Sequence, residues 1–120
     1  FPNDKLYEKL SGNKWDKRSK LEVYKDLKKE NVEITVTTSP YYFLNKKYDR
    51  KSDILTLAGV SNTKTIYCNE NGYYSIYNSD RYGFSNPDYE WDNELTDILL
   101  VGDSFTHGAC VKENENINLN

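Results

Sequence analysis

The chain has 120 residues, of which 16 are basic and 19 acidic, and its net charge of −3 argues against a broad nucleic-acid-binding surface. Apolar residues make up 37% of the chain, but 11 of them are tyrosines, whose hydroxyls need water or a partner, so the predicted dry core is modest. No apolar run approaches the ~20 residues that cross a bilayer. We expect no cofactor and no metal, because two cysteines and one histidine are too few for a zinc site.

The chain divides into three predicted regions. Residues 1–59 form an N-terminal arm, helix and strand region, residues 60–97 a β-hairpin and loop, and residues 98–120 a strand, a turn and the start of a helix. Because that last unit lacks the further strand that a parallel sheet needs, we expect a fragment of a longer protein.

The first region begins with an arm and a helix. Residues 1–15 mix charge, glycine and aromatics without a period, which predicts an extended arm. Ser19 is followed three residues later by Glu22, which matches a capping box and predicts a helix that ends near Asn31.

Several short β-prone segments follow the helix. Strict alternation over 32–37 predicts a half-exposed strand. Farther on we expect a short aromatic element, a charged turn, and a strand or apolar loop, at 41–44, 46–53 and 54–60. The runs 65–68 and 73–77 flank a segment that contains Asn71-Gly72, which predicts a β-hairpin.

The two cysteines are not in a C-x-x-C arrangement. Cys68 ends the first strand of the predicted hairpin, and Cys110 lies near the end of the chain. We expect two buried free thiols, with a disulfide as the alternative.

The most informative stretch is ILLVGDSFTHG, residues 98–108. Its four leading apolar residues predict a strand buried on both faces of a parallel sheet, whose carboxyl end carries Ser104. Gly102 allows a tight exit from the strand, and Gly108 allows close packing of a helix whose opening turn is 109–111. A serine at this place is positioned for chemistry, with its own N–H near the start of a helix.

Two common motifs do not fit this stretch. A nucleophile elbow is G-x-S-x-G, and Thr106 stands where its second glycine belongs. A P-loop needs G-K-[ST], and no such lysine is present. Residues 99–108 instead resemble the first motif block of the SGNH (GDSL-like) hydrolases. Residues 80–87 look like the loop that precedes this block in bacterial SGNH proteins linked to surface polysaccharides, so the resemblance covers roughly residues 60–112.

The resemblance implies a fold and an activity. The fold is α/β, the start of a flavodoxin-like three-layer sandwich preceded by a small α+β region with the hairpin. The activity is hydrolysis or transfer at an ester of a small molecule or carbohydrate, with Ser104 as nucleophile and backbone oxyanion donor. The other donors and the D-x-x-H base of the family belong to later blocks, which do not follow Gly108. We therefore expect the chain alone to be inactive, and the resemblance allows an extracytoplasmic or membrane-anchored parent protein.

The polar residues around the motif have simpler explanations than catalysis. His107 lies three residues after Ser104 on the same predicted turn, so we expect a packed histidine rather than a base. We expect the carboxylates of Asp80, Asp88 and Asp103 to hold turns, with a place in the lining of a cleft as the alternative for Asp80 and Asp88.

Three aromatic residues leave two alternatives open. They either wall a sugar-binding cleft or pack in the core: Tyr82, Phe84 and Trp91.

Two other functions stay open. One is a non-catalytic carbohydrate-binding or scaffold module that uses the tyrosine-rich hairpin. The other is a flavodoxin-like phosphate or nucleotide binder, in which Ser104 and Thr106 donate to phosphate. It ranks last, because the chain has no glycine-rich cradle.

Overall fold

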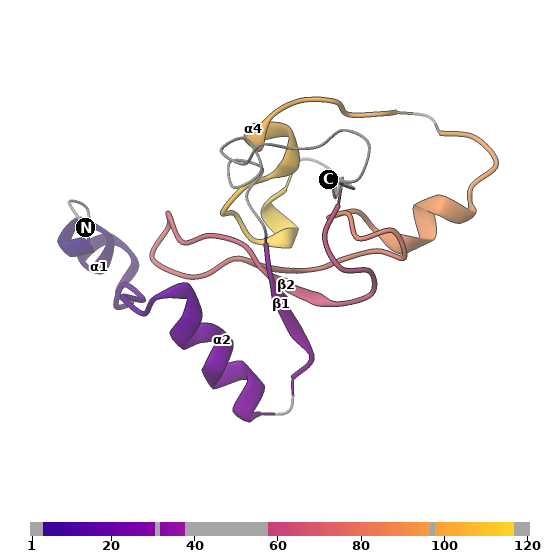
Figure 1. The fold of residues 1–120 in the computed structure, drawn as a ribbon. Helices are drawn as coiled ribbons and strands as arrows, with labels where there is room; N and C mark the ends of the chain where they lie inside the picture. Colours follow the sequence, from indigo (N-terminus) through magenta and orange to yellow (C-terminus); the bar gives the residue numbers. More distant parts are fainter. Residues whose placement is uncertain (1–3, 31, 38–57, 97, 117–120) are drawn as a thin grey trace, which may run out of the picture.

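The structure is a computed structural model that describes residues 4–30, 32–37, 58–96 and 98–116. It has a mixed α/β fold around one small three-stranded sheet, which confirms the α/β class (Figure 1). The elements in chain order are α1 (Asp4–Ser11), α2 (Lys20–Lys29), β1 (Ile34–Val36), β2 (Lys64–Ile66), β3 (Ile76–Asn78), the 3₁₀ helix η1 (Asp88–Asp92), α4 (Ser104–His107) and the 3₁₀ helix η2 (Glu113–Glu115).

The N-terminal helix α1 corrects the prediction of an extended arm. Asp4 caps it by accepting a hydrogen bond from the backbone N–H of Lys5 at 2.7 Å. Gly12 ends it with a φ of 71°, a left-handed conformation that glycine adopts without strain. Tyr7 packs edge-on against Trp15, with 5.4 Å between the ring centroids. The spacing of apolar residues in the sequence does not predict this contact.

The second helix, α2, confirms the predicted capping box. The backbone N–H of Glu22 donates to Ser19 Oγ at 3.3 Å, and the backbone N–H of Ser19 donates to Glu22 Oε2 at 2.6 Å. The helix ends at Lys29, close to the expected end.

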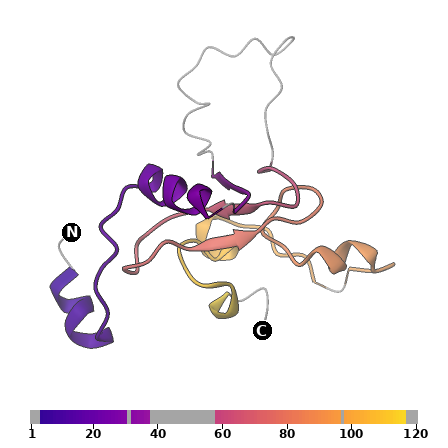
Figure 2. The same cartoon turned by 90° about the horizontal axis from the view of Figure 1, so that it is seen from below.

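The sheet has the order β1–β2–β3, with β1 parallel and β3 antiparallel to β2. Side chains alternate between its faces. On one face Ile34 and Ile66 pack with Val23 of α2, which forms the small core of the described residues. The other face carries Thr65 and Tyr77, which are paired across the hairpin. The helix α4 lies on that second side, so that α2 and α4 flank the sheet (Figure 2).

The predicted strands are present but shorter than expected. β1 occupies the middle of the alternating run 32–37. β2 and β3 form the predicted hairpin, with Ile66 opposite Ile76, and the loop at its end contains Gly72 with a φ of 82°. The elements predicted at 41–44 and 46–53 lie outside the described residues, as does 54–57, and 58–60 form no strand.

The expected buried strand at 98–101 is wrong for the described structure. The segment has no regular structure, and its side chains are exposed, up to 86% for Val101. Four consecutive apolar residues are buried only between neighbouring strands and covering helices. In the described residues β2 pairs with β1 and β3, and 98–101 is not part of that sheet.

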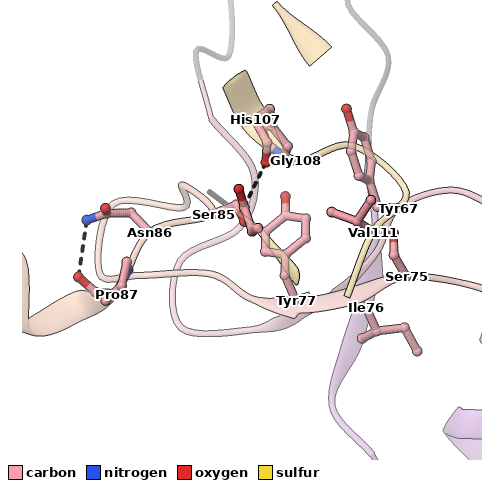
Figure 3. A pocket seen from close by; sticks show the side chains of 11 residues that line it. Tyr67, Ser75, Ile76, Tyr77, Ser85, Asn86, Pro87, His107, Gly108 and Val111 are labelled. Atoms are coloured by element: carbon pink, nitrogen blue, oxygen red, sulfur yellow. Dashed lines mark hydrogen bonds between the residues drawn. The ribbon is translucent and has the colours of Figure 1, made fainter. Parts of the chain in front are cut away.

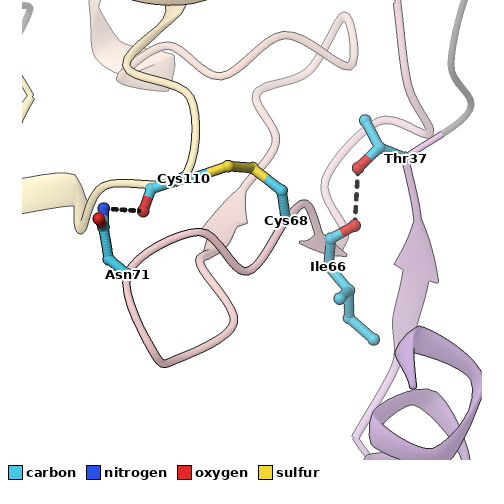
Figure 4. Close-up of a disulfide and its surroundings, with 5 residues drawn as sticks. All are labelled: Thr37, Ile66, Cys68, Asn71 and Cys110. Atoms are coloured by element: carbon cyan, nitrogen blue, oxygen red, sulfur yellow. Dashed lines mark hydrogen bonds between the residues drawn. A yellow bond between two sulfur atoms is a disulfide. The ribbon is translucent and has the colours of Figure 1, made fainter. Parts of the chain in front are cut away.

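The expected free thiols are also wrong. Cys68 and Cys110 form a disulfide, with their Cα atoms 5.1 Å apart (Figure 4). The expected helix opening at 109–111 is absent as well, because α4 starts earlier, at Ser104, and ends at Gly108. The chain then turns so that Cys110 meets the hairpin.

The capping box makes a measurable prediction about stability. We expect Ser19→Ala to lower the free energy of unfolding by about 1 kcal/mol, because the first turn of α2 loses its side-chain acceptor. Chemical denaturation followed by circular dichroism measures this. Ser61→Ala, which changes an exposed serine hydroxyl, is the control and should leave the midpoint unchanged. Equal midpoints for the two variants would contradict a stabilising cap.

Candidate functional site

Ser104 is the first residue of α4, and neighbouring residues hold the turn in which it lies. Asp103 is the N-cap, and its Oδ1 accepts a hydrogen bond from the backbone N–H of Phe105 at 3.0 Å. The carbonyl of Asp103 also accepts from the N–H of His107 at 3.0 Å. Asp103 therefore holds the turn, and the exposed Ser104 side chain has no hydrogen bond with another described residue.

Two glycines shape this turn. A Cβ on Gly102 would collide with the side chain of Thr106, so the backbone that leads into α4 lies in close contact with that helix. Gly108 has a φ of 69° and ends α4, and a Cβ there would collide with the side chain of Asn116. Asn116 in turn donates from Nδ2 to the carbonyl of His107 at 3.2 Å. Both glycines are therefore required by close contacts.

His107 is packed and does not contact Ser104 as a base. Its imidazole lies against the rings of Tyr67 and Tyr77, with centroids 4.9 Å and 5.9 Å away (Figure 3). Burial lowers the pKa of His107 below its usual value, because the charged imidazolium loses its hydration. Its buried Nε2 has no hydrogen-bond partner among the described residues.

The pocket beside His107 is too small for a substrate. Its volume is about 20 Å³, which suits one water molecule. Figure 3 shows the side chains around it, which come from the hairpin, the loop after it, and the segment that follows α4. The Ser75 hydroxyl also lines this pocket and is buried without a partner in the described part of the chain.

The loop after β3 is built on the buried carboxylate of Asp80. Asp80 is 1% exposed, and its Oδ1 accepts from the backbone N–H groups of Tyr82 and Phe84, both at 2.9 Å. Its Oδ2 accepts from Trp91 Nε1 at 2.6 Å. Gly83, with a φ of 89°, packs so closely on Gly59 that a Cβ would collide with the Gly59 carbonyl. The loop is thus fixed by one carboxylate at its centre.

This loop displays an aromatic platform, which we define as Tyr82, Phe84 and Trp91. The Tyr82 and Trp91 rings meet edge-on at 4.9 Å, and the Phe84 and Trp91 rings lie 6.3 Å apart. The three residues are 58%, 42% and 47% exposed, respectively, so they are not part of the core. Their exposure argues against the core-packing alternative.

Ion pairs connect the loop that carries the platform to η1. Arg81 makes ion pairs with Asp88 at 2.8 Å and with Asp92 at 2.7 Å, one at each end of η1. Its guanidinium lowers the pKa of both carboxyls through direct hydrogen bonds. Asp88 also accepts from the backbone N–H of Arg81 at 2.7 Å, so it has the turn-holding role expected of it.

Two features of this region had weak signals in the sequence. The central role of Asp80 depends on three donors that are up to 11 residues away, and spacing alone does not reveal it. The disulfide joins cysteines 42 residues apart, and that spacing does not reveal the pairing.

Comparisons with protein-family models, curated proteins and solved structures found no match. Within the described ranges, no three His, Cys, Asp or Glu side chains gather closely enough to hold a metal ion. No helix in those ranges has the length and apolarity to cross a membrane.

The burial of neutral His107 makes a prediction about pH. The unfolded chain takes up a proton at its only histidine near pH 6.5, and the folded chain does so at lower pH. Stability is therefore greatest above about pH 6.5 and falls as the pH drops toward the lowered pKa of the folded state. We expect the melting temperature to decline between about pH 7 and about pH 5.

The matched variant is His107→Gln, which removes the titrating group. Its melting temperature should vary less over the same pH range, whatever its absolute value. An equal slope in the two proteins would contradict a buried neutral His107.

Proposed function

We propose that the chain supplies the nucleophile turn of an SGNH-type ester hydrolase, with Ser104 as the nucleophile. The observation that carries this proposal is the hydroxyl of Ser104, which is exposed at the head of a turn fixed by Asp103 within the motif GDSFTHG. An accessible hydroxyl on an ordered turn is the minimum that acyl transfer requires. The backbone N–H of Ser104 is the proposed oxyanion donor.

The proposed chemistry is acyl transfer in two steps. A base takes the Ser104 proton as Oγ attacks the ester carbonyl, and the alcohol leaves from the tetrahedral intermediate. Water then hydrolyses the acyl-serine. His107 is the only histidine in the sequence and is packed against two tyrosines. The base is therefore proposed to come from residues outside this chain.

The finer fold is also part of this proposal. The sequence of 98–101 suits a strand buried between layers, and its four apolar side chains are exposed in the described structure. A flavodoxin-like sandwich would bury them by pairing strands on either side.

An O-acyl group on a carbohydrate is the proposed substrate.

Ser104→Ala tests the nucleophile in the full-length protein that contains this chain. We expect the variant to lose hydrolysis of p-nitrophenyl acetate by a factor of about 10³ or more, because the substitution removes the proposed acyl acceptor. Ser61→Ala is the control and should keep full activity, since this exposed serine lies outside the proposed site. Unchanged hydrolysis by Ser104→Ala would disprove the assignment.

The 120-residue chain by itself should be unreactive, because its only histidine, His107, is packed against Tyr67 and Tyr77. A fluorophosphonate probe, read by mass spectrometry, should leave Ser104 of the isolated chain unlabelled. Labelling of Ser104 there would show that the chain carries a complete activating system.

A second candidate function is carbohydrate binding without catalysis. The observation that favours it is the aromatic platform, whose three exposed rings are held in place by the buried Asp80. An exposed ring face can stack on the apolar face of a sugar, and a ring fixed in advance loses little entropy on binding. The acidic residues of η1, Asp88, Glu90 and Asp92, disfavour an anionic ligand.

Trp91→Ala tests this second candidate. A glycan array identifies a ligand, and titration should then show affinity reduced by about tenfold or more, the value of one well-packed aromatic contact. Asp80→Asn should also weaken binding. The asparagine side chain has one acceptor oxygen and an N–H₂ group, so it cannot accept hydrogen bonds from all three donors.

Tyr89→Ala is the matched control, since Tyr89 is an exposed aromatic of the same helix outside the platform. Equal losses in Trp91→Ala and Tyr89→Ala would argue against the platform. Glycan binding by a protein that lacks esterase activity would favour this candidate over the first.

A further inference from the structure

The segment that carries Ser104 is attached to the hairpin at one loop. The Cys68–Cys110 disulfide joins Cys68, two residues beyond the end of β2, to Cys110, three residues beyond the end of α4. Next to it, Asn71 Nδ2 donates to the carbonyl of Cys110 at 3.0 Å (Figure 4). The disulfide and this hydrogen bond thus both attach Cys110 to the loop of the hairpin that contains Cys68 and Asn71.

Ring contacts also join this segment to the same hairpin. His107 packs on Tyr67 and Tyr77, and Lys112 lies over the ring of Tyr73 at 5.2 Å. On the other side of Ser104, residues 98–103 are exposed and belong to no strand. A helix of four residues has little stability of its own in water. The attachment at Cys110 therefore contributes to the position of Ser104.

The backbone at Cys110 also needs a restraint. Its φ is 62°, in the left-handed region that residues with a Cβ disfavour. Gly108, two residues earlier, has a similar φ without that cost. A cysteine kept in this conformation returns more readily to an ordinary one when its cross-link is cut.

We propose that the Cys68–Cys110 disulfide is a redox-controlled clamp on the Ser104 turn. In the oxidised chain it docks α4 on the hairpin, and in the reduced chain α4 is released while the sheet stays folded. The clamp itself follows from these contacts, whereas its effect on catalysis rests on the proposed role of Ser104.

The exchange reaction is balanced with a dithiol as the reductant. Its thiolate attacks Sγ of Cys68, which is partly exposed, whereas Cys110 is 2% exposed. The Sγ–Sγ bond breaks, and Cys110 leaves as a thiolate that takes up a proton. The second thiol of the reductant then attacks the mixed disulfide, which releases Cys68 as a thiol and the reductant as its own disulfide.

Hydrogen exchange of the chain with and without dithiothreitol tests the clamp. We expect the amides that close α4, those of His107, Gly108 and Ala109, to exchange about tenfold or more faster after reduction. The hairpin amides should change little, and we take Tyr67 and Ser75 as their reporters. Alkylation and mass spectrometry confirm the redox state of both cysteines.

The double variant Cys68→Ser/Cys110→Ser supplies the control for the reagent. It should show fast exchange at α4 without dithiothreitol and no further change when dithiothreitol is added. Unchanged exchange at α4 on reduction would overturn the proposal. Loss of protection in the hairpin together with α4 would also overturn it, because the disulfide would then stabilise the whole fold rather than clamp one turn.

The catalytic consequence has a separate readout. In the full-length protein, the rate of fluorophosphonate labelling at Ser104 should fall on reduction and recover on reoxidation. If Ser104→Ala keeps esterase activity, the proposed function fails while the exchange result still decides the clamp. If Ser104 is essential but α4 exchanges equally in both redox states, the clamp fails and the function stands.

Discussion

The burial of Ile66 in the middle of the sheet is the contact on which the described structure depends. Ile66 is fully buried and packs with Val23 of α2 and Ile34 of β1, so it joins the helix and two strands into one core. The next residue, Tyr67, continues the same strand direction and contributes its ring to the contact with His107. A single short strand thus supports α2 on one face and the Ser104 segment on the other.

So small a core leaves the loops to be ordered by polar contacts. Asp80 does this for the loop after β3, where one carboxylate satisfies two backbone donors and an indole N–H. A buried carboxylate is costly to desolvate and is tolerated here because both of its oxygens accept hydrogen bonds. Its effect is to keep Trp91 at a fixed place on the surface.

The local parts of this structure could be predicted from sequence, and the non-local parts could not. The capping box at Ser19 and the hairpin turn at Gly72 depend on neighbours within a few residues, and both are present. The burial expected for 98–101 depends on which strands are near it, and no such strand lies in the described part of the chain. The cross-link between Cys68 and Cys110 spans 42 residues, so spacing alone left free thiols as the expectation.

The same division applies to the candidate site. The sequence places Ser104 after Asp103 and before a helical turn, and these are local features that the structure also has. What brings this turn to the hairpin is tertiary: the disulfide, Asn71 and the two tyrosines around His107.

All of these contacts act on the carboxyl side of Ser104. On its amino side, residues 98–101 expose their apolar side chains, and exposed apolar surface is stabilised by any partner that covers it. A serine nucleophile must be held within a fraction of an ångström of its productive position. The proposed nucleophile therefore needs restraint on both sides. The disulfide restrains the carboxyl side, whereas the described residues leave 98–101 exposed on the amino side.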